Sequence, residues 1–138
     1  MIDGEYAALD VWDITGQEKI RGRVALFRKK IDGLVVVYDI TNIESFVSAQ
    51  KWVYSWMVFE KCIPLLLVGN KKDLEDDRKV ATLQGQAFAN SLSMMFIEVS
   101  SKNVDEVNKA FDLLASKLVV CISDKRNNNK SSYPCIMI

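Results

Sequence analysis

Several residue types that support common protein chemistries are rare or absent in this chain of 138 residues. It has no histidine, which excludes histidine-based acid–base catalysis and histidine metal sites. Its three cysteines, Cys62, Cys121 and Cys135, show no C-x-x-C spacing, and so sparse and odd a count is typical of a reducing, intracellular setting. An excess of one charge is also lacking, because 18 basic residues balance 18 acidic ones. This balance argues against a nucleic-acid binder, which needs a basic field.

Long apolar runs are absent too, and none in the sequence would span a bilayer. The first five residues lead directly into a predicted strand, so we expect no signal peptide before the fold. Apolar residues nevertheless make up 49% of the chain, which is too many for a disordered protein. The length is sufficient for one domain with a hydrophobic core.

Stretches with strand character alternate with stretches of helical periodicity. Strands are expected at residues 6–12, 34–38, 63–68 and 95–99, and helices at residues 44–59, 82–92 and 104–120, with Thr82 as an N-cap. This alternation predicts an α/β fold with a mostly parallel sheet and helices on both faces. Ligands of such sheets bind beyond the carboxyl ends of the strands.

The periodicity stops after about Ser123, and residues 123–132 are polar. Such a composition predicts a flexible tail. We therefore expect a domain over residues 1–122 and a tail over residues 123–138.

The motif DITGQE, residues 13–18, directly follows the first predicted strand. The Asp13 carboxylate can hold a hydrated magnesium ion there, and Gly16 lets a backbone N–H approach a terminal phosphate. Gln17 can orient an attacking water. Taken alone, the pattern is also typical of a strand-end turn, in which aspartate and glycine are common.

The motif NKKD, residues 70–73, follows the third predicted strand. Asp73 can accept hydrogen bonds from the N1–H and the exocyclic amine of guanine, a pair of donors that adenine lacks. Such bonds to a charged group contribute about 1.5–3 kcal/mol each. The stem of Lys71 can cover the base or ribose, and Asn70 can tie loops together. The alternative is a lysine-rich surface turn, but the position after a buried strand favours guanine recognition.

The motif EVSSK, residues 98–102, ends the fourth predicted strand. Backbone N–H groups of this motif can meet the guanine carbonyl, and Lys102 can pack on the base. On its own, this motif is equally an ordinary loop start.

The last four residues, CIMI, form a prenylation box in which Cys135 is the lipid acceptor. A chance cysteine near the chain end is the alternative. The box follows a polar, weakly basic spacer, and each basic residue near an anionic leaflet contributes about 1 kcal/mol. One lipid chain anchors only marginally, so reversible membrane attachment is expected.

In this order the motifs resemble those of the Ras superfamily of small GTPases. DITGQE resembles that family's DTAGQE, NKKD its N-K-x-D, and EVSSK its E-x-S-A-K. The sequences YDITN at residues 38–42 and LVGNK at residues 67–71 resemble the Rab branch most. The likeness covers residues 1–120.

The resemblance implies a Ras-like P-loop GTPase fold and a switch between GTP and GDP, with Mg²⁺ as cofactor. Asp13 would bind magnesium through water, the Gly16 amide would sense the terminal phosphate, and Gln17 would be catalytic by positioning water. The guanine contacts would come from Asn70, Lys71, Asp73, Ser100, Ser101 and Lys102. Rab-like relatives act in vesicle traffic, which implies effector and regulator proteins of Rab type as partners. It also implies a place on the cytoplasmic face of an intracellular membrane, with a cytosolic pool.

Some residues depart from the family pattern. Thr15 replaces alanine and adds a hydroxyl beside the phosphate site. Ser101 also replaces alanine, but that contact uses the backbone, so little change is expected. The final Ile138 is closest to leucine, which favours geranylgeranyl over farnesyl.

A larger departure is the absence of the family's G-x-x-x-x-G-K-[ST] phosphate loop, since none of the six glycines begins that pattern. The sequence resembles the family from the turn before its third strand onward, without the first strand, first helix and first switch. We therefore expect weak nucleotide affinity, because phosphate contacts are missing. We also expect a gap or re-pairing between the strands at residues 6–12 and 34–38, with exposed edges and poor stability.

Two functions of different classes fit these features. The first is a Rab-like small GTPase, represented by a chain without its phosphate loop. The second is a non-catalytic, prenylated interaction module that competes for Rab partners. An adenine-nucleotide enzyme fits poorly because of Asp73.

Overall fold

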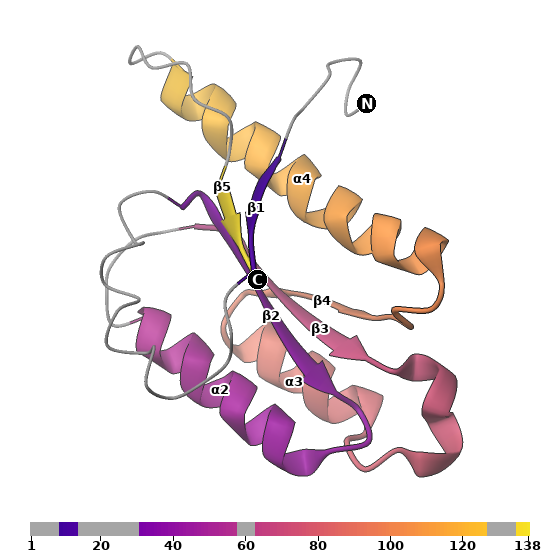
Figure 1. The fold of residues 1–138 in the computed structure, drawn as a ribbon. Helices are drawn as coiled ribbons and strands as arrows, with labels where there is room; N and C mark the ends of the chain where they lie inside the picture. Colours follow the sequence, from indigo (N-terminus) through magenta and orange to yellow (C-terminus); the bar gives the residue numbers. More distant parts are fainter. Residues whose placement is uncertain (1–8, 14–30, 58–62, 127–134) are drawn as a thin grey trace.

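The computed structural model describes residues 9–13, 31–57, 63–126 and 135–138, which form a five-stranded sheet with helices on both faces (Figure 1). The strands are β1 (Asp10–Trp12), β2 (Gly33–Asp39), β3 (Leu65–Asn70), β4 (Met95–Glu98) and β5 (Cys135–Met137). The helices are α2 (Ile43–Met57), the 3₁₀ segment η2 (Lys72–Asp77), α3 (Thr82–Ser91) and α4 (Val104–Arg126). The strand order is β1-β5-β2-β3-β4, and every pairing is parallel. The predicted α/β class with a parallel sheet is confirmed.

Two hydrophobic clusters hold the helices against the sheet. In β2 the side chains alternate, so that Val36 and Tyr38 face one cluster and Val35 faces the other. The first cluster also contains Phe46 and Val53 of α2, and the second contains residues of α4. Figure 1 shows α2 and α3 on one side of the sheet and α4 on the other. Among the described helices, none is long and apolar enough to cross a membrane.

Asparagine side chains cap the N-termini of two helices. Asn42 Oδ1 accepts the N–H groups of Glu44 and Ser45 at the start of α2, at 2.9 and 3.2 Å. Asn103 Oδ1 accepts the N–H of Asp105 at 3.1 Å at the start of α4. Both satisfy N–H groups that have no partner within the helix.

The helix α3 begins differently from the sequence-based expectation. Its N-cap is Ala81, and Thr82 is the first helical residue, so the prediction of Thr82 as N-cap was wrong. The side chain of Gln84 replaces the expected cap, because its Oε1 accepts the Ala81 N–H at 2.8 Å. The Thr82 hydroxyl instead donates to Glu98 Oε2 at 3.0 Å, which links the start of α3 to the end of β4.

The prediction of a flexible tail over residues 123–138 was wrong for residues 123–126 and 135–137, which lie in a helix and a strand. The helix α4 continues to Arg126 rather than stopping near residue 120, and Cys135–Met137 is a strand. A gap or a re-pairing was expected between the strands at residues 6–12 and 34–38, and the structure shows the re-pairing, with β5 between β1 and β2. The edges that were expected to be exposed there are paired with β5. An extended apolar segment satisfies the backbone groups of two neighbouring strands, which a solvated tail would leave without partners in the sheet.

Candidate nucleotide site

The carboxyl ends of β2, β3 and β4 meet at one edge of the sheet. In the strand register, Asp39 lies beside Asn70 and Gly69 lies beside Glu98. Beyond these ends the Lys72 N–H donates to the Val99 carbonyl at 3.1 Å. This bond brings the two loops that carry NKKD and EVSSK together.

Asn70 fastens the same two loops with its side chain. Its Oδ1 accepts the N–H of Ser101 at 3.0 Å and the N–H of Lys71 at 2.7 Å. Lys71 has a φ of 67°, a left-handed conformation that is uncommon for a residue with a side chain. The backbone of the NKKD loop is therefore held in a specific, mildly strained shape.

Asp73 lies at the centre of this arrangement. Its Oδ1 accepts the Ser100 hydroxyl at 2.7 Å, and its Oδ2 accepts the Lys102 ammonium at 2.7 Å. These bonds, from Lys102 first and Ser100 second, lower the pKa of Asp73 below its usual value. The carboxylate is thus ionised and oriented while its surroundings stay open to solvent.

The Lys71 side chain, whose stem was expected to cover the base or ribose, has its ammonium bound to a carboxylate. Its Nζ forms an ion pair with Asp39 Oδ2 at 2.6 Å, so the ammonium is directed at the end of β2. Asp39 Oδ1 also accepts the N–H and the hydroxyl of Thr41, at 2.8 and 2.7 Å. Burial works to raise the pKa of Asp39, but the hydrogen bonds from Lys71 and Thr41 outweigh it, and the pKa is lowered.

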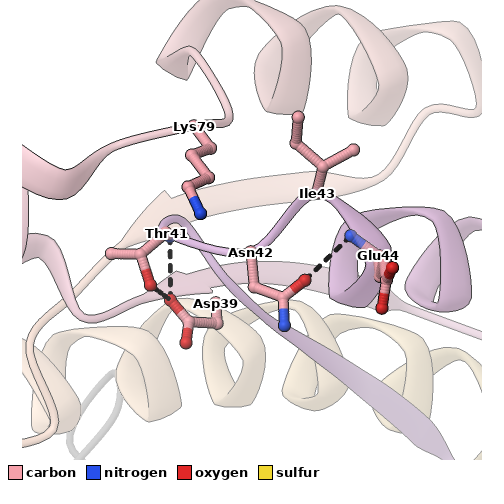
Figure 2. Close-up of a pocket in the computed structure, with 6 residues that line it drawn as sticks. All are labelled: Asp39, Thr41, Asn42, Ile43, Glu44 and Lys79. Atoms are coloured by element: carbon pink, nitrogen blue, oxygen red, sulfur yellow. Dashed lines mark hydrogen bonds between the residues drawn. The ribbon is translucent and has the colours of Figure 1, made fainter.

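A hollow of about 470 Å³ opens beside this ion pair (Figure 2). It is lined by Asp39, Thr41, Asn42, Ile43, Glu44 and Lys79. Its polar groups largely bond to one another, since Thr41 binds Asp39 and Asn42 caps α2. No motif in the sequence indicated this hollow. Its lining adjoins the NKKD loop through Lys71.

Two further side chains, those of Glu106 and Arg78, stabilise the site and lie outside the three motifs. Glu106 Oε2 accepts the Ser100 N–H at 2.7 Å, and its other oxygen accepts Lys72 Nζ at 3.2 Å. Arg78 binds both oxygens of Glu98, at 2.7 and 2.8 Å. Only 8% of the Glu98 side chain is exposed, and a carboxylate so little exposed needs a cation beside it.

The residues of the first motif are less completely described. Asp13 is exposed directly after β1, while Gly16 and Gln17 lie outside the described residues. Among residues 9–13, 31–57, 63–126 and 135–138, no three metal-binding side chains cluster. Magnesium usually binds one or two carboxylates and completes its shell with water and phosphate oxygens, and Asp13 can supply one carboxylate. In this structure the register sets Trp12 level with Met137 and Leu34, so Asp13 lies about four residues before the end of β2 at Asp39.

The backbone of Cys135 lies in β5, where it pairs with Asp10 of β1. The structure therefore places the expected lipid acceptor in the sheet and not in a free tail. Both strand neighbours of β5 are parallel to it.

Comparison with known proteins agrees with the motifs and the sheet. The Ras family model matches residues 1–120. The chain is 32% identical to Ras-related protein RABD1 of Arabidopsis thaliana over 133 residues, covering 96% of this chain and 65% of that protein. It is 35% identical to Ras-related protein Rab-4A of Mus musculus over 119 residues, covering 86% of this chain and 55% of that protein. It is also 35% identical to Ras-related protein Rab-11C of Dictyostelium discoideum, covering 91% of this chain and 56% of that protein.

These coverages mean that the chain spans between about half and two thirds of the length of the curated relatives it matches. The family model nevertheless covers most of the chain, and the motifs DITGQE, NKKD and EVSSK all lie within the matched residues. The chain belongs to the Ras family of small GTPases, with Rab proteins among its relatives.

Proposed function

We propose that this chain is the guanine-recognising part of a Rab-type small GTPase. The observation that carries the proposal is the position of Asp73, which Ser100 and Lys102 hold at the junction of two strand-end loops. A preorganised carboxylate of this kind accepts paired N–H donors without first having to be ordered.

The hydrogen-bonding capacity of Asp73 leaves room for a base. An ionised carboxylate offers about four acceptor positions, and the bonds from Ser100 and Lys102 use two of them. Guanine presents two adjacent donors, N1–H and the exocyclic amine, which match the two remaining positions. The Lys102 side chain is 77% exposed, so it can move onto the face of the base as guanine enters.

The loop that Asn70 fastens supplies the rest of the base site. The Ser101 N–H donates to Asn70 Oδ1 at 3.0 Å and the Lys102 N–H donates to Ser100 Oγ at 3.3 Å, so the guanine carbonyl would have to share or displace these acceptors. Lys71 closes the side toward the hollow beside Asp39. Asp13, Gly16 and Gln17 serve phosphate, magnesium and hydrolysis in the intact family arrangement, with GTP-dependent effectors and Rab-type regulators as partners. The biological role is vesicle traffic.

Base selectivity tests this proposal directly. Asp73→Asn replaces one acceptor by an amide donor, which suits xanthine because xanthine carries a carbonyl where guanine has an amine. Nuclear magnetic resonance titrations with GDP, XDP and ADP should show GDP perturbing the amides of residues 100–102 in the wild type. XDP should do so in the variant. We expect weak affinity, and micromolar or tighter binding of GDP in calorimetry would contradict that expectation.

Two outcomes would overturn the base assignment itself. ADP and GDP binding equally well would remove the role of Asp73 as the selector. An unchanged preference in Asp73→Asn would do the same. Asp76→Asn is the matched control, since it changes an exposed carboxylate in the same 3₁₀ segment without touching the loop contacts.

Membrane attachment through a prenyl group on Cys135 is a part of the proposal. A single lipid and the weakly basic sequence before it give reversible anchoring, and hence both a membrane-bound and a cytosolic pool. The lipid would be geranylgeranyl by the likeness of Ile138 to leucine. Mass spectrometry of the chain expressed in eukaryotic cells decides whether Cys135 carries it.

One observation favours the second candidate, a non-catalytic interaction module. On α2, Ile43, Val47 and Tyr54 are 54%, 41% and 54% exposed, and their spacing of four and seven residues places them on one helical stripe. Such a stripe suits a helical or flat apolar partner. Under this hypothesis the chain should compete with a GTP-loaded Rab-type protein for its effector. Val47→Asp should abolish the competition, while Asp73→Asn should leave it unchanged.

A further inference from the structure

Asp39, the last residue of β2, lies outside the three motifs but holds a lysine that belongs to one of them. The Lys71 ammonium lies 2.6 Å from Asp39 Oδ2. The other oxygen, Oδ1, accepts the N–H and the hydroxyl of Thr41, at 2.8 and 2.7 Å (Figure 2). The Asp39 backbone is held as well, because its N–H donates to Ser45 Oγ at 2.9 Å. The carboxylate therefore has a fixed place and direction at the end of β2.

The other end of the Lys71 side chain is fixed by the backbone of the NKKD loop. The Lys71 N–H donates to Asn70 Oδ1 at 2.7 Å, and the Lys71 carbonyl accepts the Leu74 N–H at 2.8 Å. Its φ of 67° is left-handed, so the loop and not a regular strand sets the direction of the Cα–Cβ bond. A lysine stem that is anchored at both ends has already lost much of the rotamer freedom that a solvated lysine keeps.

Lys71 and Asp73 extend toward opposite neighbours of β3. Asp73 bonds to Ser100 and Lys102, which follow β4, whereas Lys71 extends to Asp39 at the end of β2. Because β3 lies between β2 and β4 in the sheet, a base that bonds to Asp73 lies over the end of β3. The Lys71 stem then bounds this base on the side of β2.

The two lysines beside the base differ in the carboxylate that holds them. The Lys102 ammonium is bonded to Asp73 itself at 2.7 Å. Guanine competes for that carboxylate, so Lys102 has to move when the base enters. Lys71 is bonded to Asp39, which the base does not need, so Lys71 keeps its place throughout binding.

We infer that Asp39 is a positioning residue for base binding. By holding the ammonium, it keeps the Lys71 stem extended as a preformed wall of the base site. The benefit is entropic, because the stem does not have to be ordered when the base binds. The wall covers the base without reading its edge, so Asp39 contributes to affinity, while the choice between guanine and xanthine belongs to Asp73. The inference rests on the proposed function for the base, whereas the anchoring of Lys71 stands on the contacts alone.

Carbon relaxation of the lysine Cε groups, measured on the full chain without nucleotide, tests the anchoring. The Lys71 Cε should be clearly more ordered than that of Lys51, an exposed lysine of α2. In Asp39→Asn, Lys71 should become as mobile as Lys51. Asparagine keeps an Oδ1 acceptor for Thr41, so the urea midpoint should change little. Glu44→Gln is the matched control, since it neutralises another carboxylate in the lining of the same hollow and should leave Lys71 ordered.

Nucleotide titrations, followed at the amides of residues 100–102, test the positioning role. Asp39→Asn should bind GDP about three- to tenfold more weakly than the wild type does, and Glu44→Gln should bind it equally well. The same loss should appear for XDP when Asp39→Asn is added to Asp73→Asn, because the wall does not read the base edge. Lys71→Met keeps an apolar stem without the ammonium, so adding Asp39→Asn to it should cost no further affinity.

Three results would overturn the inference. One is a Lys71 side chain as mobile as Lys51 in the wild type. Another is unchanged GDP affinity in Asp39→Asn. The third is a double variant, Asp39→Asn with Lys71→Met, in which the two single losses add, as they would if Asp39 acted only on general stability.

The relaxation measurement also separates this inference from the proposed function. An ordered Lys71 in a chain whose amides at residues 100–102 do not respond to GDP would contradict guanine recognition. It would leave the anchoring of Lys71 by Asp39 standing.

Discussion

Replacing Arg78 by methionine should be the most damaging single change near the candidate site. The guanidinium bridges two carboxylates, with bonds of 2.8 and 2.7 Å to Glu75 and of 2.7 and 2.8 Å to Glu98. Its Nη1 also donates to the Val80 carbonyl at 2.9 Å. Only 14% of the Arg78 side chain and 8% of the Glu98 side chain are exposed, so the ion pair between them is largely desolvated.

The loss of stability depends on how well each carboxylate is solvated once the guanidinium is removed. Glu75 is 65% exposed and regains water, so its share of the loss is small. Glu98 would keep only the Thr82 hydroxyl, and loss of one partner of a buried pair costs about 3–5 kcal/mol. We expect a loss of about 3 kcal/mol in the free energy of unfolding, at the low end because neither side chain is completely sealed.

Urea unfolding at pH 7, followed by circular dichroism, measures this loss. With a slope of about 2 kcal/mol per molar, the midpoint should fall by about 1.5 M. Arg78→Lys keeps the charge but not the planar fork, so its loss should be intermediate. Arg78→Met combined with Glu98→Leu should recover at least half of the loss, because both charges are then gone. A single-variant loss below about 1 kcal/mol, or a double variant as unstable as the two single losses added together, would refute the reasoning.

Three further expectations concern other parts of the molecule. Gly85→Ala should destabilise the fold by about 1–2 kcal/mol in urea unfolding, although alanine favours helices, because its Cβ would lie 2.5 Å from Tyr38 Oη and 2.7 Å from Phe96 Cε2; a stabilised variant would contradict the packing. The pKa values of Asp73 and Glu106 are lowered in the folded state, so their contribution to stability is complete above the unfolded pKa of about 4 and is lost as the pH falls through the folded pKa. The urea midpoint should therefore fall in acid, and this fall should be smaller in Asp73→Asn. Cys135→Ser should move the protein from membranes into the soluble fraction of fractionated cells, and unchanged membrane association would exclude Cys135 as the anchor.

The sequence alone was sufficient to predict the core of the fold and to find the motifs NKKD and EVSSK. The apolar runs of β2 and β3 were recognisable because a buried parallel strand has no polar side to interrupt it. NKKD and EVSSK were found from their positions after such strands. Their contacts with each other were not, because the register of β3 against β4 brings Asp73 to Ser100 across 27 positions of sequence.

Other features needed the three-dimensional structure. The partner of Glu98 is Arg78, 20 residues away, and no local pattern joins them. Thr82 has the chemistry of an N-cap, but a nearer acceptor on Glu98 takes its hydroxyl and leaves the start of α3 to Gln84.

The two ends of the described chain show most clearly what the sequence determines and what needs the tertiary structure. The sequence by itself determined that the strand before Asp13 belongs to a parallel sheet and that the last four residues are apolar. Only the tertiary structure decided that these two segments pair. A strand's side-chain pattern records which face is buried, whereas its neighbour is chosen by which backbone groups remain without partners once the rest of the sheet has formed.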